Sequence, residues 1–423
     1  MIPVMNPTMD QLRDESGLHG TAEGILNPTN EADAQEMIRD YKDRGITFQG
    51  TRTGICGGSV PEGGVIIGTA WMKWVWDRQE DGDDILAHVG AGVTLDQLDT
   101  ALRKDYKGYI WPPRPTEVTA TVGGVVALGS KGINAVHYGE TRNYVAGVKL
   151  IDNDGELQTI TDPDELDKIV GSEGKMGLIT DVTVRLVKKP EATWGVGLFF
   201  EDEMKAAECA QEMKTLFDGN PSVFLTGNEF IDRDGMNLVD EFREQSDAIA
   251  SVPAFPEGAQ AMLYVEISGQ MSQMMPSLMP IIQCSSKYGS DPNTSWAQTS
   301  EAGVDQLHAV RHAVAEGSNV RIAQARIQDE SIVKLGVDIA RPDADFAKVL
   351  ADYREDLNNT NVASVVFGHV YNNNLHVNLL PKDKAEYDEA YELMKKWVAK
   401  AVSEEAEVFD EHGLGRIKAD LLP

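Results

Sequence analysis

The chain has 423 residues, 42% of them hydrophobic and 25% charged, so it is long enough for two hydrophobic cores and too apolar to be disordered. Its 38 basic and 68 acidic residues give a formal net charge of -30. Charge of this sign repels nucleic-acid phosphates and anionic lipids, which argues against partners of those two kinds. The acidic balance fits either a partner with a basic face or a host whose cytosolic proteins are generally acidic.

The cysteines and the hydrophobic runs exclude several further classes. Cys56, Cys209 and Cys284 are odd in number, far apart and outside any CxxC motif, which excludes a cysteine-bound iron–sulfur cluster, a zinc knot and a disulfide framework. The first 20 residues lack a basic region followed by an apolar run, and no stretch has the apolar length of a membrane span. We therefore expect a cytoplasmic protein.

In chain order, the first expected element is an amphipathic helix over residues 31–44, with Ala34, Met37, Ile38 and Tyr41 on one face. From residue 45 to 189, short β-rich runs such as 64–67 and 182–186 alternate with glycine-dense turns and with a helix over 94–104. This mixture predicts an α+β domain.

The run Lys188-Lys189-Pro190 predicts a domain boundary. Beyond it we expect a second α+β unit, with an antiparallel sheet covered by helices. Its expected elements are a helix over 203–217, a strand over 261–267, helices over 343–358 and 384–407, and between these a strand pair near 363–380. The predicted domains are therefore 1–190 and 191–407, and the segment 408–423 is expected to return to the first domain.

Three glycine clusters occupy residues 49–59, 121–124 and 171–177. Such loops let backbone amides approach an anion and can cradle a pyrophosphate, but each cluster alone also fits a tight turn. Two standard nucleotide motifs are absent. Gly90-Ala91-Gly92 has no third glycine of a dinucleotide fingerprint, and Gly129-Ser130-Lys131 stands where a P-loop requires Gly-Lys-Ser/Thr.

Taken in order, the clusters resemble the FAD-binding domain of the vanillyl-alcohol oxidase and p-cresol methylhydroxylase superfamily from about residue 25 to 189. The motifs are Gly-x-x-Thr-Gly-x-x-Gly-Gly at 50–58, Gly-x-Gly-Val-x-Leu at 90–95, Pro-Pro-x-Pro-Thr at 112–116, Thr-x-Gly-Gly at 121–124, Tyr-Gly at 138–139 and Gly-Ser-Glu-Gly at 171–174. The resemblance implies that FAD is bound by Gly50, Thr51, Arg52, Thr53, Gly54, Gly57, Gly58, Ser59, Pro115, Thr116, Thr121, Gly123, Gly124, Gly129, Ser130, Gly132, Tyr138, Glu173, Gly177 and Ile179. Because the first cluster has no histidine, we expect the flavin to be non-covalent.

This chain departs from the family pattern at three positions of the FAD half. Gln49 replaces the usual arginine, Arg52 the usual glycine, and Gly129 the usual asparagine.

Residues 365–380 predict a β-hairpin around the turn Tyr371-Asn372-Asn373-Asn374. In a hairpin symmetric about that turn, His369 lies directly opposite His376, and two imidazoles on one face can hold a divalent metal. Strand histidines bonded to Asn378 or to solvent are an equally good interpretation. Glu411-His412 offers a third ligand, although such a pair also occurs at the ends of helices.

The hairpin and the Glu-His-Gly-x-Gly motif at 411–415 together resemble the C-terminal domain of FAD-linked oxidases, which occurs in D-lactate dehydrogenases, the D subunit of glycolate oxidase and D-2-hydroxyglutarate dehydrogenases. The resemblance implies that His369, His376 and Glu411 bind zinc, manganese or iron and that His412 is the catalytic base. It assigns Arg311 and Lys334 to the substrate carboxylate, although a surface arginine on a helix is the commoner case. The usual Gly-Asp-Gly turn is replaced here by Tyr371-Asn372-Asn373.

By resemblance, the chain is expected to oxidise a small D-2-hydroxy acid, above all D-lactate, with FAD and a divalent metal. Electrons would pass to a protein acceptor such as electron-transferring flavoprotein or an iron–sulfur subunit, with quinone as the alternative acceptor. The alternatives are a D-2-hydroxyglutarate or glycolate dehydrogenase, and a non-catalytic subunit that relays electrons through FAD. Most relatives continue past the position of Gly415 with a further helix and an Asp-Pro…Asn-Pro-Gly-Lys tail that this chain lacks, so part of the flavin-side wall is expected to be either missing or supplied by a partner.

Overall fold

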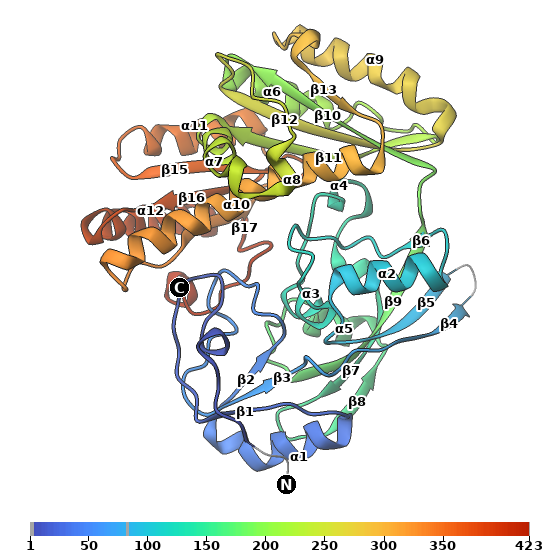
Figure 1. Cartoon of the computed structure of the whole chain (residues 1–423), viewed down its shortest axis with the longest axis vertical. Coiled ribbons are helices and arrows are strands. Elements are labelled where there is room, and N and C mark those ends of the chain that lie inside the picture. The colour runs from blue at the N-terminus through green and yellow to red at the C-terminus, as the bar shows by residue number, and fades with distance from the viewer. Residues whose placement is uncertain (1–3, 82–83, 423) are drawn as a thin grey trace. The chain divides into compact units, whose positions relative to one another are not determined.

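The computed structural model describes residues 4–81 and 84–422 and divides into two compact units (Figure 1). The first unit comprises Met1–Gly132, Tyr138–Lys189 and Glu411–Asp420, and the second comprises Ile133–His137, Pro190–Asp410 and Leu421–Pro423. Each unit mixes helices with sheet, and the expected α+β class is confirmed. No helix in the described ranges is long and apolar enough to cross a bilayer.

The first unit contains two sheets. The smaller is parallel, in the order β1-β3-β2, and the larger is antiparallel, in the order β4-β5-β9-β7-β8 with β6 paired to β9. The strands are β1 (Gly24–Leu26), β2 (Ile46–Gln49), β3 (Val65–Gly68), β4 (Val75–Asp81), β5 (Asp84–Gly90), β6 (Tyr109–Ile110), β7 (Val145–Ile151), β8 (Leu157–Ile160) and β9 (Leu178–Lys188). The helices are α1 (Glu31–Tyr41), α2 (Leu95–Asp105), α3 (Val122–Leu128), α4 (Ala135–Tyr138) and α5 (Pro163–Ile169), α4 lying mostly in the second unit.

Local chemistry explains where α1 begins and ends. The Asn30 side chain accepts from the Asp33 amide at the start of α1, whose predicted apolar face buries Ala34, Met37 and Ile38. The regular helix ends at Tyr41 rather than at Arg44, because the last turn tightens into a 3₁₀ helix over Lys42–Arg44.

The second unit is built on one antiparallel sheet in the order β13-β10-β12-β11-β15-β16-β14-β17 (Figure 1). Its strands are β10 (Ala192–Phe200), β11 (Val223–Asp232), β12 (Ala261–Gly269), β13 (Trp296–Gln298), β14 (Leu335–Ala340), β15 (Ala363–His369), β16 (Asn374–Leu380) and β17 (Glu407–Val408). Its helices are α6 (Glu203–Met213), α7 (Arg233–Phe242), α8 (Asp247–Ala250), α9 (Met271–Lys287), α10 (Glu301–Gln328), α11 (Phe346–Leu357) and α12 (Lys384–Ser403). The predicted helix-covered antiparallel sheet is confirmed.

The face of this sheet that packs against α10 carries the polar residues described in the next subsection. Met262, Tyr264 and Glu266 alternate onto this face of β12, where Tyr264 packs against His308 of α10. Met262 and Tyr264 belong to an apolar core that includes Leu307 and Val310 of α10. The polar residues that follow on the same face therefore lie between a sheet and a long helix.

Two expectations about helices in this unit are wrong. The helix expected over 384–407 ends at Ser403, because Glu405 adopts a left-handed φ of 58° and Glu407–Val408 then join the sheet as β17. The helix expected over 203–217 ends at Met213.

Candidate active site

The histidine hairpin forms as predicted, but in a different register. The turn is Val370–Asn373, closed by a 3.1 Å bond from the Asn373 amide to the Val370 carbonyl, with Asn373 at a left-handed φ of 56°. His369 therefore pairs with Asn374 and His376 with Phe367, so the prediction that the two histidines are directly opposed is wrong. A shift of two residues preserves the face, and the imidazole centroids lie 5.2 Å apart.

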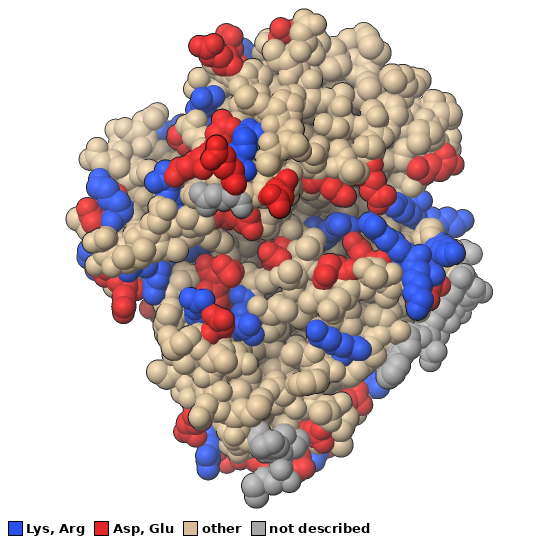
Figure 2. Space-filling view, in the orientation of Figure 1, with Lys and Arg blue, Asp and Glu red and all other residues tan. Residues whose placement is uncertain are grey.

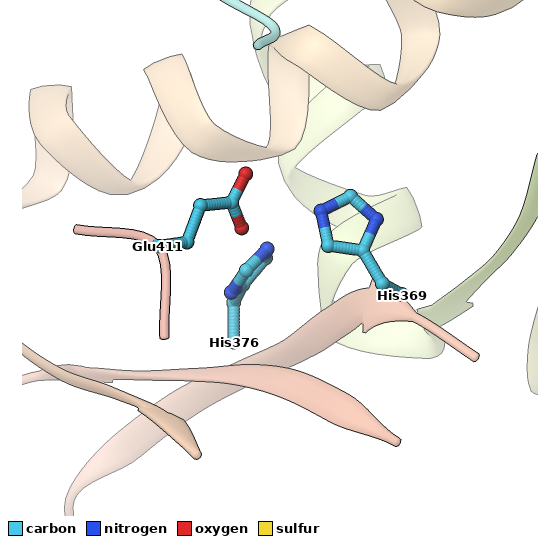
Figure 3. Close-up of side chains that lie close together, drawn as sticks. All are labelled: His369, His376 and Glu411. Atoms are coloured by element: carbon cyan, nitrogen blue, oxygen red, sulfur yellow. The ribbon is translucent and has the colours of Figure 1, made fainter. Parts of the chain in front are cut away.

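The hairpin histidines are joined by a carboxylate. His369, His376 and Glu411 each offer one ligand atom, and these atoms all lie within 4.8 Å of one another (Figure 3). All three side chains are buried, with exposed fractions of 1%, 4% and 7%. Two imidazoles and one carboxylate suit zinc, manganese or iron, and three protein ligands leave positions for a water or a substrate. The donor set fits a catalytic divalent metal.

Glu411 is positioned through its neighbour Asp410. The Asp410 amide donates to the Asp338 carbonyl over 3.1 Å. The carboxylate of Asp410 accepts from the side-chain amides of Asn372 at 2.9 Å and Asn374 at 3.1 Å. The hairpin turn that carries the histidines thus also holds the backbone that carries the third potential ligand.

A second buried carboxylate, that of Glu229 on β11, contacts His369 of the hairpin and Arg311 of α10. Its Oε1 lies 2.6 Å from Nδ1 of His369, which is its direct partner in the sheet. Its Oε2 accepts from Nε of Arg311 over 3.2 Å. Glu229 was not predicted from the sequence, although an acidic residue between the apolar runs at 223–225 and 230–231 was an available signal, because a buried charge requires a partner.

Arg311 lies on α10 and is only 7% exposed, so the alternative of a surface arginine is wrong. Its guanidinium carbon lies 4.9 Å from the centre of the Phe367 ring. Lys334 is also buried and donates to the side-chain oxygen of Asn319 on α10 over 2.6 Å. His412 directly follows Glu411 and is half-buried. The structure thus links Arg311 to His369 through Glu229.

A further polar cluster lies next to this one on the same sheet face. The Glu266 carboxylate accepts from Tyr264 at 2.5 Å and from Thr226 at 2.8 Å, and it pairs with His308 at 2.7 Å. Burial acts to raise the pKa of Glu266, but His308, Tyr264 and Thr226 outweigh that effect and lower it. In this cluster a second buried carboxylate is paired with a half-buried histidine, and the cluster does not include the potential metal ligands.

The first glycine cluster forms an open loop in the first unit. Among the described residues, no backbone carbonyl accepts from the amides of Thr51, Arg52, Thr53 or Gly54. Arg52 has a left-handed φ of 64°, and Gly57 one of 79°. A run of amides without a backbone acceptor in the described part of the chain is suited to an anion, so the loop fits the FAD diphosphate.

The second cluster packs closely against the first. Thr121 accepts from the Gly124 amide at the start of α3, and a Cβ on Gly50 would lie 2.5 Å from the Thr121 hydroxyl. A Cβ on Gly123 would lie 2.6 Å from that of Ala91, and one on Gly132 would lie 2.0 Å from the Arg114 carbonyl oxygen. Gly132 is thus required for close backbone packing, whereas Gly50 and Gly123 leave room for the side chains of Thr121 and Ala91, whether or not these glycines also contact a cofactor.

The other predicted FAD residues are distributed around these loops in the first unit. Gly58 and Thr116 are exposed, whereas Ser59, Pro115, Gly129 and Tyr138 are half-buried and Ser130, Gly177 and Ile179 are buried. Glu173, at a left-handed φ of 55°, accepts from the Gly415 amide at 2.8 Å. Glu173 therefore holds the Glu-His-Gly-x-Gly segment.

Comparisons with known proteins cover almost the whole chain. A family model described as an FAD binding domain matches residues 22–161, and one described as the C-terminal domain of FAD linked oxidases matches residues 189–423. The chain is 24% identical to the glycolate oxidase subunit GlcD of Bacillus subtilis (strain 168), over 95% of this chain and 82% of that protein. It is 25% identical to a D-lactate dehydrogenase of Archaeoglobus fulgidus (93% and 83% covered) and 25% identical to the mitochondrial D-2-hydroxyglutarate dehydrogenase of Rattus norvegicus (96% and 73% covered).

Solved structures support the fold. An alkyldihydroxyacetonephosphate synthase superposes with a TM-score of 0.66 at 17% identity, covering 89% of this chain and 71% of that one. The expected two-part FAD-oxidase architecture is confirmed.

Proposed function

This chain belongs to the FAD-linked oxidases, and we propose that it oxidises a small D-2-hydroxy acid, D-lactate in preference, to the 2-oxo acid. The observation that carries the proposal is the buried group of His369, His376 and Glu411, linked through Glu229 to the buried Arg311. A metal group beside a guanidinium suits a substrate that carries a hydroxyl next to a carboxylate. Relatives named for D-lactate, glycolate and D-2-hydroxyglutarate support the same substrate class.

The proposed FAD site uses the loop at 50–59 and the α3 start. FAD is non-covalent in this proposal, because residues 50–59 contain no histidine. The amides of residues 51–54, which no backbone carbonyl of the described residues accepts from, support the assignment of this loop to the diphosphate. The roles of the remaining predicted contacts are part of the proposal.

Each side chain of the site has one proposed role in the reaction. When bound, the metal supplies a Lewis acid that lowers the pKa of the substrate hydroxyl, and FAD supplies the acceptor for the hydride from the substrate Cα. His369, His376 and Glu411 would hold the metal. Arg311 and Lys334 orient the carboxylate, and His412 takes the hydroxyl proton. Loss of one proton and one hydride converts the alcohol to the ketone.

The electron acceptor is proposed to be a protein, such as electron-transferring flavoprotein or an iron–sulfur subunit. The acidic net charge of -30 supports docking to a basic surface. Figure 2 shows acidic and basic side chains interspersed on the face that it displays. A cytoplasmic location is proposed together with this acceptor.

The test is anaerobic reduction of the flavin by a panel of hydroxy acids. D-lactate should bleach the flavin absorbance band, and His412→Ala should slow the bleaching by about 10²–10⁴-fold. L-lactate acting as fast as D-lactate would refute the stereochemistry, and a flavin that no 2-hydroxy acid reduces would refute the substrate class. Faster reduction by glycolate or D-2-hydroxyglutarate would reassign the substrate within that class.

The remaining alternative is a subunit that holds FAD only to relay electrons. Metal analysis of the purified protein distinguishes the two, because a relay requires no bound zinc, manganese or iron. Retention of the three potential ligands in one buried group favours the enzyme.

A further inference from the structure

We propose that Glu229 is a positioning residue that couples metal binding to substrate binding, by holding a metal ligand with one carboxylate oxygen and the substrate-binding arginine with the other. The inference rests on the proposed function, since it takes His369 as a metal ligand and Arg311 as the carboxylate clamp.

The geometry assigns the two oxygens to different partners. Oε1 of Glu229 lies 2.6 Å from Nδ1 of His369, and Oε2 accepts from Nε of Arg311 at 3.2 Å. Glu229 and His369 are 1% exposed and Arg311 is 7% exposed. Glu229 is paired with His369 across the β11–β15 ladder, so the backbone fixes the first contact before any ligand binds.

The contact to His369 decides which ring nitrogen can bind a metal. An ionised carboxylate only accepts hydrogen bonds, so the neutral imidazole must carry its proton on Nδ1, which lies against Glu229. Nε2 then carries the lone pair, and a metal ligand needs that lone pair. A carboxylate behind a ligand histidine also fixes the orientation of the ring, and loss of such a partner typically costs about 10–100-fold in metal affinity.

The contact to Arg311 gives the same carboxylate a second effect. Arg311 is buried against Phe367, and Glu229 provides it with an opposite charge. Removing that negative charge makes the buried guanidinium more costly to keep in place. Loss of Glu229 should therefore loosen the metal ligand and the clamp together, whereas loss of either neighbour alone removes one function.

The experiment compares Glu229→Gln with the matched control Glu266→Gln in the FAD-loaded protein. Both replace a buried carboxylate that faces α10 and contacts a histidine, but Glu266 contacts His308 rather than a potential ligand. A glutamine at 229 keeps one accepting oxygen and turns an amide toward the other donor. Affinity for Mn²⁺ and Zn²⁺ is measured by chelator competition with elemental analysis, and KM and kcat for D-lactate are measured at saturating metal.

Glu229→Gln should weaken metal affinity by about 10–100-fold and raise the KM for D-lactate even when metal is saturating. Glu266→Gln should keep the wild-type metal affinity within about threefold, as expected for a site without contact to the ligands. Wild-type metal affinity in folded Glu229→Gln would overturn the inference and leave the proposed function intact. Wild-type protein that binds no metal would instead overturn the proposed function.

Glu229→Asp keeps the experiment decisive if the glutamine variant does not fold. Aspartate preserves the charge, but its side chain is one methylene shorter, so the carboxylate lies farther from His369 and Arg311. Glu229→Asp should therefore lower metal affinity, but by less than Glu229→Gln. A folded Glu229→Asp protein with unchanged metal affinity and unchanged KM would also overturn the inference.

Discussion

The two hydrogen bonds that the hairpin turn donates to Asp410 give the most discriminating prediction about the three potential metal ligands. Replacing Asp410 by alanine removes the acceptor for Asn372 and Asn374, which are 7% and 0% exposed. Replacing it by asparagine keeps an oxygen at the same place, and one amide oxygen can accept both bonds. Because both donors use the same oxygen of Asp410, the two variants form a matched pair.

The magnitude follows from the number and kind of bonds lost. A hydrogen bond to a charged group contributes about 1.5–3 kcal/mol net, and two such bonds are lost in Asp410→Ala. Asp410 is only half-buried, so water replaces part of this, and we expect a net loss of about 2–3 kcal/mol. If that energy orders the Glu411 backbone, metal affinity should fall by about 30–150-fold. Asp410→Asn loses only the charge and should cost about 1 kcal/mol, or about fivefold.

The assay is chelator competition for Mn²⁺ or Zn²⁺ on protein whose folding is checked by thermal unfolding. The account predicts the order wild type, Asp410→Asn, Asp410→Ala for decreasing metal affinity. Equal metal affinity in wild type and Asp410→Ala would show that the hydrogen bonds of Asp410 to the hairpin turn do not position Glu411. Equal losses in the two variants would show that the charge of Asp410, rather than its hydrogen bonds, is the important property.

Two further predictions address the FAD loop and the sheet of the second unit. A methyl group on Gly54 would lie 3.7 Å from Asp14, an ordinary contact, so Gly54→Ala should leave the unfolding of FAD-free protein unchanged but weaken FAD binding by about tenfold, or about 1.4 kcal/mol. Fluorescence titration with FAD measures this, and unchanged affinity would remove Gly54 from the cofactor site. Burial raises the pKa of Asp232 to about 6 against the opposing effect of Arg354. Because the folded state holds this proton more tightly than the unfolded state, stability from this group is present below pH about 4 and is lost as pH rises to about 6, by roughly 3 kcal/mol. The difference in unfolding free energy between wild type and Asp232→Asn should show this slope between pH 4 and 6, and a flat difference would contradict the assigned pKa.

The sequence predicted the parts of the fold that depend on local patterns. The α1 face of Ala34, Met37 and Ile38 is buried as its 3.6-residue period requires. The hairpin, its two histidines and the carboxylate of Glu411 are also brought together as expected.

Features that depend on backbone geometry or on long-range contacts were not predictable in the same way. The hairpin register was wrong by two residues, because Asn373 takes the left-handed position and releases Asn374 into the strand. The true end of α12 depends on the pairing of β17 with β14, which are distant in sequence. Glu229 lies 82 residues from Arg311 and 140 from His369, so no local pattern could identify its partners.

The central claim is that a metal held by His369, His376 and Glu411 is required for transfer of hydride from a D-2-hydroxy acid to FAD. The most direct measurement is the rate of anaerobic flavin reduction by D-lactate in three samples: native protein, protein stripped by chelator, and stripped protein reloaded with Mn²⁺ or Zn²⁺. The account predicts that stripping abolishes reduction, that reloading restores it, and that His369→Ala cannot be restored. Reduction of the stripped protein at the reloaded rate would contradict the account.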